Sequence, residues 1–157
     1  PLPDVEVAPR HEVVAFLAES LVTSLMNIAS DIREETGEQV EQMFGFLVGD
    51  SLRIVPAEVL GDVRDDRTLA GVRQLAADSG ADAVFTVGEG WASHNPMAGP
   101  PSKDPARMEI VMVTASGPGV NIMHVRPILG PKELGPVEAL GGFTGRFSNL
   151  SGREGMN

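Results

Sequence analysis

The chain has 157 residues, no cysteine, and a formal net charge of −10 from 22 acidic and 12 basic residues. It can therefore form neither disulfides nor thiolate metal sites, and its charge disfavours contact with the phosphate backbone of nucleic acids. The hydrophobic content of 42% is that of a globular protein, and the length fits one domain that buries its own core.

Residues 12–35 have the pattern of one long amphipathic helix. Apolar residues recur at every third or fourth position, which places them on one face. They are Val14, Leu17, Leu21, Leu25, Ile28 and Ile32. Gly37 follows where a left-handed C-terminal cap is favoured. A second helix is predicted from Asp65 or Asp66, either of which can cap its first turn, to Gly80, which ends it.

A β-hairpin is predicted between the two helices. Residues 43–48 alternate in the manner of a strand, Gly49-Asp50-Ser51 forms the turn, and residues 52–55 begin the return strand. Three further strands follow the second helix, and the last two of them are apolar on both faces. These three strands are predicted at residues 83–91, 108–115 and 120–129.

The elements therefore follow in the order helix, two strands, helix, three strands. This order predicts an α+β fold with a mostly antiparallel five-stranded sheet and two helices, and we expect both helices to pack against one face of the sheet. The order resembles that of profilin-like and roadblock-like folds. The roadblock resemblance implies a regulatory scaffold that dimerises through its sheet edge or its helices. Residues 1–129 are predicted to form the α+β domain, and residues 130–157 an extended C-terminal arm.

The predicted arm is rich in glycine and proline and has few large apolar residues, so it cannot pack as a unit of its own. Its apolar residues recur every three or four positions and could anchor it along its own domain or on another subunit. These candidate interface residues are Leu134, Val137, Leu140, Phe143, Phe147 and Leu150. Trp91, the one tryptophan of the chain, is either a cover of the core or a further interface anchor.

Candidate catalytic residues gather around a long proline-rich loop at residues 93–106, where functional side chains tend to lie. They are Glu89, His94 and Asp104, which would have to converge in one pocket to act together. His94 and Asp104, with Ser102, also have the residue types of a hydrolase triad, but no nucleophile elbow accompanies them.

Two glutamates on predicted neighbouring strands, Glu89 and Glu109, could form a pair of catalytic carboxylates. The favoured interpretation is that they are solvated or form a salt bridge with Arg107 or Arg126.

Part of the chain resembles the JAMM metalloproteases. Glu41 precedes Gly45-Phe46-Leu47-Val48-Gly49, and His94-Asn95-Pro96 precedes Ser102 and Asp104. In that family a glutamate precedes a similar strand, and a His-x-His-Pro segment leads to a serine and an aspartate. Here Ala92 stands at the position of the first histidine, Asn95 interrupts the His-Pro pair, and the serine-to-aspartate spacing is one residue short. One histidine leaves too few of the three protein ligands that a catalytic zinc needs, so we expect no metal or cofactor.

A second resemblance is to a group of small uncharacterised bacterial and phage-encoded proteins. In that group a strand ending in an aromatic residue leads to a Pro-Ser-x-x-Pro-x-Arg loop and an apolar strand. Here the strand begins at Ala83 and reaches Trp91, and the loop runs from Pro101 to Arg107. The resemblance implies a bacterial or phage source and no particular activity.

The leading hypothesis is a non-enzymatic structural or interaction protein, a subunit of a homo-oligomer or of a larger assembly such as a phage virion. Its partners would be copies of itself or other subunits, bound through the arm, so that removing residues 130–157 would abolish assembly and leave the domain folded. The alternative is a metal-dependent hydrolase of degenerate JAMM-like type that uses residues 89–109. No apolar run approaches the about 20 residues that span a bilayer, and no signal peptide is visible. We therefore expect no membrane contact and a cytoplasmic or virion location.

Overall fold

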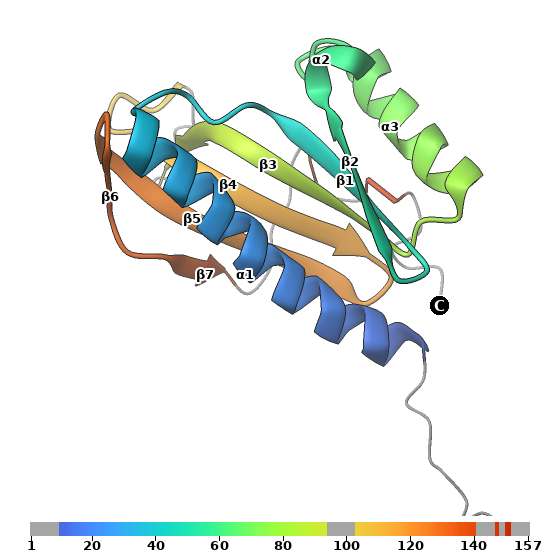
Figure 1. Cartoon of the computed structure of the whole chain (residues 1–157). Coiled ribbons are helices and arrows are strands. Elements are labelled where there is room, and N and C mark those ends of the chain that lie inside the picture. Colours follow the sequence, from blue (N-terminus) through green and yellow to red (C-terminus); the bar gives the residue numbers. More distant parts are fainter. Residues whose placement is uncertain (1–9, 94–102, 141–146, 148–149, 152–157) are drawn as a thin grey trace, which may run out of the picture.

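A computed structural model describes residues 10–93, 103–140, 147 and 150–151 of the chain. Three helices and seven strands form in this part of the chain (Figure 1). In chain order they are α1 (Arg10–Thr36), β1 (Met43–Val48), β2 (Ser51–Pro56), α2 (Ala57–Leu60), α3 (Asp66–Ser79), β3 (Ala83–Ala92), β4 (Met108–Gly117), β5 (Val120–Gly130), β6 (Glu133–Leu134) and β7 (Glu138–Leu140).

The strands form one antiparallel sheet in the order β2-β1-β3-β4-β5-β6, and β7 also pairs with β5. The predicted α+β class and the antiparallel sheet are confirmed. The predicted element count is wrong, because the described residues contain seven strands and three helices instead of five and two. The extra strands, β6 and β7, come from residues assigned to the arm, and they extend the sheet beside β5. The extra helix, α2, is a single short turn.

Helix α1 lies across one face of the sheet, over β3, β4 and β5 (Figure 1). Its buried side chains are Val14, Ala18, Val22, Leu25, Met26, Ala29 and Ser30. The apolar face predicted from the sequence is therefore displaced around the helix, since Ile28 and Ile32 are 55% and 40% exposed. The apolar arc of α1 is wider than the strip that touches the sheet, and that strip includes two alanines that let the helix approach closely.

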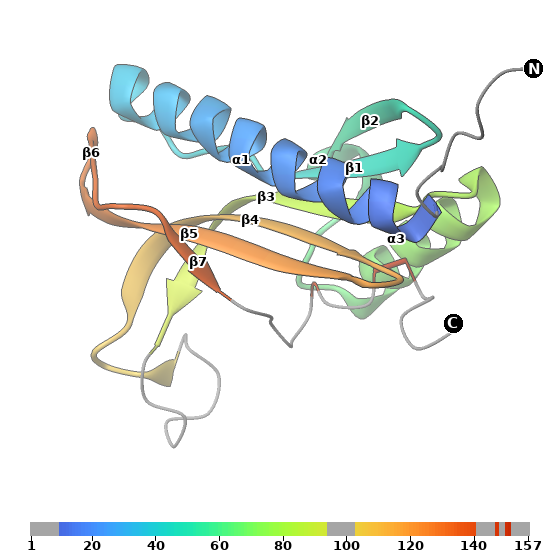
Figure 2. The ribbon, with the colours of Figure 1, turned by 90° about the horizontal axis from the view of Figure 1, so that it is seen from below.

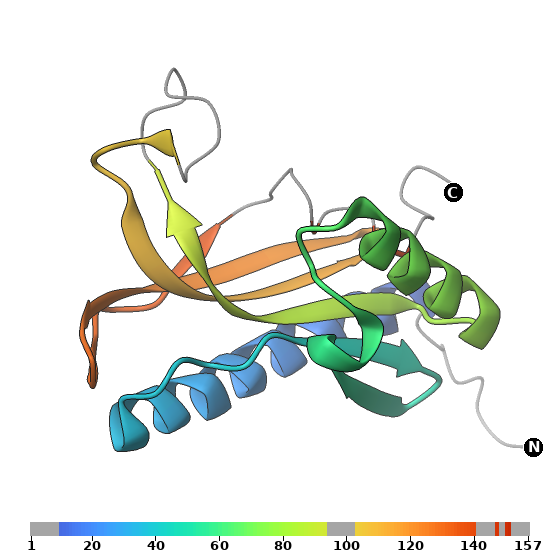
Figure 3. The same ribbon diagram turned by 90° about the horizontal axis from the view of Figure 1, so that it is seen from above.

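Helix α3 packs on the opposite face of the sheet from α1, as Figures 2 and 3 show. The expectation that both helices share one face is wrong. Successive side chains of a strand point to opposite faces, and β3 is apolar on both. Phe85 belongs to the core beneath α1, whereas Val84 belongs to the core beneath α3. The sheet is thus the middle layer of three.

The ends of α3 confirm the sequence prediction. The side chain of Asp65 accepts a hydrogen bond of 2.9 Å from the backbone N–H of Arg67, which caps the first turn. Gly80 ends the helix with φ of 68° and ψ of 36°, in the left-handed conformation that favours glycine.

Two residues from the C-terminal part of the chain complete the face of the sheet that carries α3. Leu150 is fully buried in the core beneath α3. The ring of Phe147 meets that of Phe44 edge to face, with 6.3 Å between centroids, and it also contacts a smaller cluster formed by Ile110, Met112 and Val125. These two residues of the predicted arm therefore pack on their own domain.

By length and composition alone, α1 is long and apolar enough to cross a membrane, in contrast to the expectation from the sequence. Its most apolar 18-residue window has a mean hydropathy of 1.6, and 39% of that window is buried inside the fold. It is the one helix of this kind in the described part of the chain. Core helices of globular proteins and N-terminal signal sequences share these properties. In this fold α1 packs on the sheet, through side chains that extend from Val14 to Ala29.

Gly117, at the end of β4, lies directly against the backbone of the residue before β3. A Cβ atom at position 117 would lie 2.4 Å from the carbonyl oxygen of Asp82, and a backbone oxygen cannot rotate away. We expect Gly117→Ala to lower the free energy of unfolding by about 1–3 kcal/mol, as overpacking does, in urea denaturation followed by circular dichroism.

The matched control for this substitution is Gly90→Ala. A Cβ atom at position 90 would meet Met112 Cε at 3.8 Å, an ordinary contact. We expect this variant to unfold with a free energy within about 0.5 kcal/mol of the parent chain. Equal losses in the two variants would show that the close approach at Gly117 is not what fixes the glycine.

Candidate functional site

The far ends of β3 and β4 curl away from the C-terminal turn of α1 (Figures 2 and 3). The side chains of this region line a groove. It consists of two adjoining depressions of about 350 and 540 Å³. Both are lined by Arg33, Trp91 and Glu109. The smaller one continues towards Gln39 after α1, and the larger one continues along the end of β5 at residues 127–131. We take this groove as the candidate functional site.

Strand alternation brings the groove side chains together. Glu89 and Trp91 are two residues apart on β3, so they share a face. Val87, two residues before Glu89, belongs to the core beneath α1, so this is the α1 face. Trp91 is the register partner of Glu109 on β4, which places the two side chains next to one another. On this face of β3, the apolar side chains of Phe85 and Val87 belong to the core, and the next residue on the same face, Glu89, is charged and lies near the end of α1.

The floor of the groove is an ion pair between α1 and β3. Arg33 Nη1 donates to both carboxylate oxygens of Glu89, at 3.2 and 3.0 Å, and each side chain is only 11% exposed. The backbone N–H of Val40 donates to Glu89 Oε2 at 2.6 Å. Glu89 therefore ties the end of α1 and the following segment to the sheet. The sequence analysis expected Glu89 to pair with Arg107 or Arg126. Its partner is Arg33 instead.

Arg33 Nε, a buried nitrogen of this ion pair, has no hydrogen-bond partner among the described residues. Gln42 lies against Gly88, because a Cβ atom at position 88 would come within 2.2 Å of Gln42 Oε1. Gly88 thus leaves room for the Gln42 side chain, whose buried Nε2 also has no partner among the described residues, on the face of the sheet opposite Glu89.

Trp91 forms the wall of the groove. The guanidinium carbon of Arg107 lies 4.4 Å from the centroid of its ring, a cation–π contact. The side chain is nevertheless 42% exposed. Arg107 is held in turn by its own donation from Nη1 to the carbonyl oxygen of Asp104, at 3.3 Å. Trp91 is therefore an exposed aromatic ring held in place from one side.

Asp104 anchors the segment that leads into β4. The Ser93 hydroxyl donates to its carboxylate, and the backbone N–H of Ala106 donates to Oδ1 at 2.9 Å. The hydrogen bond from Ser93, followed by that from Ala106, holds the pKa of Asp104 below its usual value. The ionised carboxylate therefore contributes stability above the pKa of the unfolded chain, and that contribution is lost as the pH falls through the lower folded value.

The structure assigns structural partners to two of the three candidate catalytic residues. Glu89 is held by Arg33 and Val40, and Asp104 by Ser93 and Ala106. His94 lies outside the described residues, as does Ser102. Among the residues that the structure describes, no group of three or more histidine, aspartate or glutamate side chains could hold a metal ion. Glu41, the glutamate of the JAMM resemblance, is exposed.

The candidate interface residues fall into two groups. Leu134 is partly buried against the core beneath α1, and Phe147 and Leu150 pack on the other face of the sheet. Val137 and Leu140 are 50% and 37% exposed, and Leu140 pairs with Met123 of β5. Phe143 lies outside the described residues. Their role in an interface stays a prediction.

Arg33 is a groove residue that the sequence analysis did not identify. It lies in the helical apolar pattern and makes its decisive contact 56 residues away in the chain. One signal could have identified it, because Arg33 is the only lysine or arginine between Arg10 and Arg53. A single basic residue next to Asp31 and Glu34, at the end of an apolar helix, indicates that its side chain forms a specific ion pair and is not simply exposed to solvent.

Comparison of the chain with models of known protein families, with curated proteins and with solved structures finds no match. A function therefore has to follow from the chemistry of the groove residues. The groove combines the exposed ring of Trp91, the guanidinium of Arg107 stacked on that ring, the ion pair of Arg33 with Glu89, and the carboxylate of Glu109.

Proposed function

We propose that the protein is a non-enzymatic interaction subunit of an assembly, and that it holds a protein partner in the groove at the end of α1. The observation that carries the proposal is Trp91, 42% exposed and held in place by the Arg107 guanidinium. Tryptophan and arginine are the residues most enriched among those that dominate binding at protein interfaces. A ring already fixed in orientation also loses little conformational freedom when a partner covers it.

The surroundings of Trp91 support a protein partner over a small molecule. Met108 and Leu129, both exposed, line the larger depression beside it, so an apolar strip continues from the ring towards the end of β5. The smaller depression adds the polar and charged side chains of Gln39 and Glu89 to the residues that line both. A mixture of apolar anchors and a polar rim is typical of interfaces between proteins.

The Trp91→Ala variant tests this proposal. We expect it to lose partner binding, because truncating a central aromatic anchor costs 2 kcal/mol or more, which is about a 30-fold loss of affinity. Self-association is measured by sedimentation velocity over a range of protein concentrations. Binding to other proteins is measured by amine-reactive cross-linking in the source cells, followed by mass spectrometry.

The chain is well suited to cross-linking because its two lysines, Lys103 and Lys132, lie close to groove residues in the sequence, Lys103 four residues before Arg107 and Lys132 directly after Pro131. Arg107 and Pro131 both line the larger depression. Phe16→Ala, which removes a 72%-exposed aromatic ring near the other end of α1, is the control. A chain that neither self-associates nor cross-links to a defined partner contradicts the proposal, and so does a Trp91→Ala variant that keeps the same cross-links.

A further inference from the structure

Resting on the proposed function, we infer that the partner in the groove is a basic segment of a different protein, whose lysine or arginine side chain lies between Glu109 and Trp91. The segment would be extended, because the groove runs from the end of α1 to the end of β5. The inference follows from the charges that the fold leaves unbalanced, from the aromatic wall and from the charge of the whole chain.

The charges that line the groove are each held by another group of the described residues, with one exception, although only Arg33 and Glu89 form an ion pair. Glu89 is neutralised by Arg33, and Arg107 is held beside Asp104, whose carboxylate it helps to keep ionised. Glu109 forms none of the ion pairs found among the described residues, although it lines both depressions. Its carboxylate is thus an available acceptor at the point where the two depressions meet.

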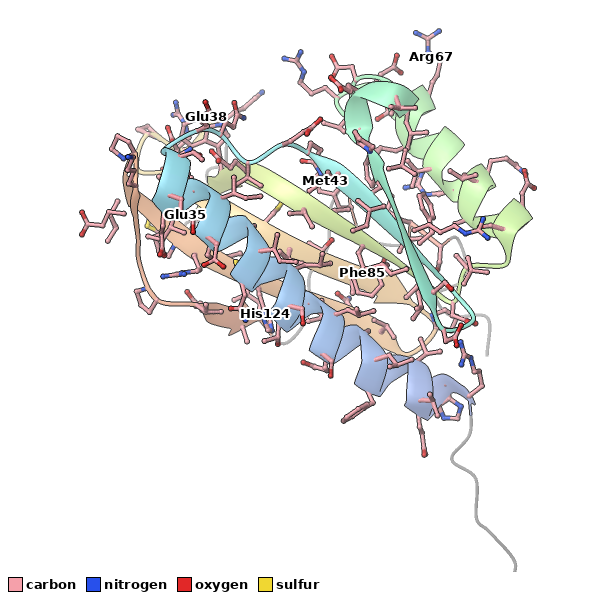
Figure 4. The ribbon with its side chains drawn as sticks, in the orientation of Figure 1. Glu35, Glu38, Met43, Arg67, Phe85 and His124 are labelled. Atoms are coloured by element: carbon pink, nitrogen blue, oxygen red, sulfur yellow. The ribbon has the colours of Figure 1, made fainter. Side chains whose placement is uncertain are left out.

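The rim of the groove at the end of α1 is also acidic. Figure 4 shows Glu35 and Glu38 at this end of the helix, and Glu41 follows in the exposed segment before β1. Three cations outside ion pairs lie in the same region, namely Lys132 beside Gly37, Lys103 next to Asp104 in the sequence, and Arg107 in the groove itself. The unpaired carboxylates outnumber them, so the groove and its rim present a net negative field to a ligand.

Trp91 and the carboxylate of Glu109 together form the proposed site for a cationic side chain. Ammonium and guanidinium groups are attracted to the face of an indole ring, and tryptophan is the best of the aromatic residues in this respect. The ring already holds one cation, Arg107, at 4.4 Å from its centroid. The cross-strand pairing of Trp91 with Glu109 sets the ring and an unpaired carboxylate side by side. A lysine or arginine side chain can lay its apolar stem on the ring while its charged end reaches the carboxylate.

The charge of the chain argues against a second copy as the occupant. Two molecules that each carry a formal charge of −10 repel one another. Arg64 and Arg67 are the most exposed arginines among the described ion pairs. Each is already neutralised within its own chain, by Asp62 and Asp65 respectively. A different protein with a basic segment is therefore the occupant that the charges favour.

Trp91 is also the reporter for the experiment, since the chain has no other tryptophan and no tyrosine. The probe is an unstructured eight-residue peptide with three arginines, and the comparison peptide has glutamate in place of each arginine. We expect the basic peptide to change Trp91 fluorescence in a saturable way and the acidic peptide to leave it unchanged. The apparent affinity should fall as sodium chloride is raised, as for a contact between exposed charges.

The decisive variant is Glu109→Gln, which keeps the shape of the side chain and removes its charge. We expect it to weaken binding of the basic peptide about fivefold, the upper range for an exposed ion pair. Glu19→Gln makes the same charge change on α1, about 21 Å along the helix from Arg33 at 1.5 Å per residue, and should leave the affinity unchanged. Circular dichroism of both variants confirms that they are folded.

The inference is overturned if the basic peptide gives no saturable change, if both peptides bind alike, or if Glu109→Gln binds as the parent chain does. It is also overturned if the chain self-associates and Glu109→Gln abolishes that association, because the occupant would then be a second copy. In each of these cases the loss of cross-links in Trp91→Ala would still support the groove as an interface. The failure of the basic partner is therefore distinct from the failure of the proposed function.

Discussion

Replacing Leu150 with alanine is expected to lower the free energy of unfolding by about 2–5 kcal/mol, the range for removing a leucine side chain from a core. Leu150 is fully buried among residues of α3, β1 and β3, so its truncation leaves a cavity in the layer between α3 and the sheet. Guanidinium chloride unfolding followed by circular dichroism measures the change.

Leu129→Ala is the matched control, because this leucine is 62% exposed at the end of β5. We expect its free energy of unfolding to stay within about 0.5 kcal/mol of the parent value. A similarly small change in Leu150→Ala would show that the C-terminal residues do not contribute to the core. If the large loss is found, removal of residues 130–157 should unfold or strongly destabilise the domain, contrary to the expectation from composition.

Neutralising either partner of the Arg33–Glu89 pair should cost about 3–5 kcal/mol, because it leaves an uncompensated charge in a largely buried site. Each side chain is 11% exposed. In Arg33→Met the Glu89 carboxylate keeps only the Val40 N–H. In Glu89→Gln the guanidinium of Arg33 loses its counter-ion. Urea unfolding of the two variants gives the free energies.

The double variant with both substitutions completes a thermodynamic cycle. We expect it to lose clearly less stability than the sum of the two single losses, since no buried charge remains unpaired. Arg64→Ala is the control for an exposed pair, because Arg64 and Asp62 are 88% and 53% exposed, and it should change stability by less than about 1 kcal/mol. Strict additivity of the Arg33 and Glu89 substitutions would show that the two groups do not interact.

The parts of the fold that the sequence predicts well are those with local signals. The capping aspartate and terminal glycine of α3 mark both of its ends. The predicted turn marks the hairpin of β1 and β2, although Ser51 already pairs with Val48 and the turn itself is Gly49-Asp50. β6 and β7 have only two and three residues, too few for any periodicity. They form because β5 offers an unpaired edge, which depends on the completed sheet.

Which face an element buries depends on contacts between distant segments, and here the sequence is ambiguous. The apolar arc of α1 includes Ile28 and Ile32, and only the sheet decides that Ala18 and Ala29 are buried instead. The candidate site follows the same rule. Trp91 stands out in the sequence as a lone aromatic residue at the end of a strand, whereas the pairing of Glu89 with Arg33 requires the fold.

The packing of α1 also has a consequence for synthesis of the chain. α1 precedes every described strand in the chain, and the strands that it covers most, β4 and β5, lie as far on as residues 108–130. Until those strands have left the ribosome, an apolar helix with the composition of a membrane span has no sheet to pack on. Contacts between such distant segments form late in folding. We therefore expect the apolar face of α1 to stay exposed in the nascent chain until β4 and β5 can cover it, and transiently exposed apolar surface of this kind is prone to aggregation.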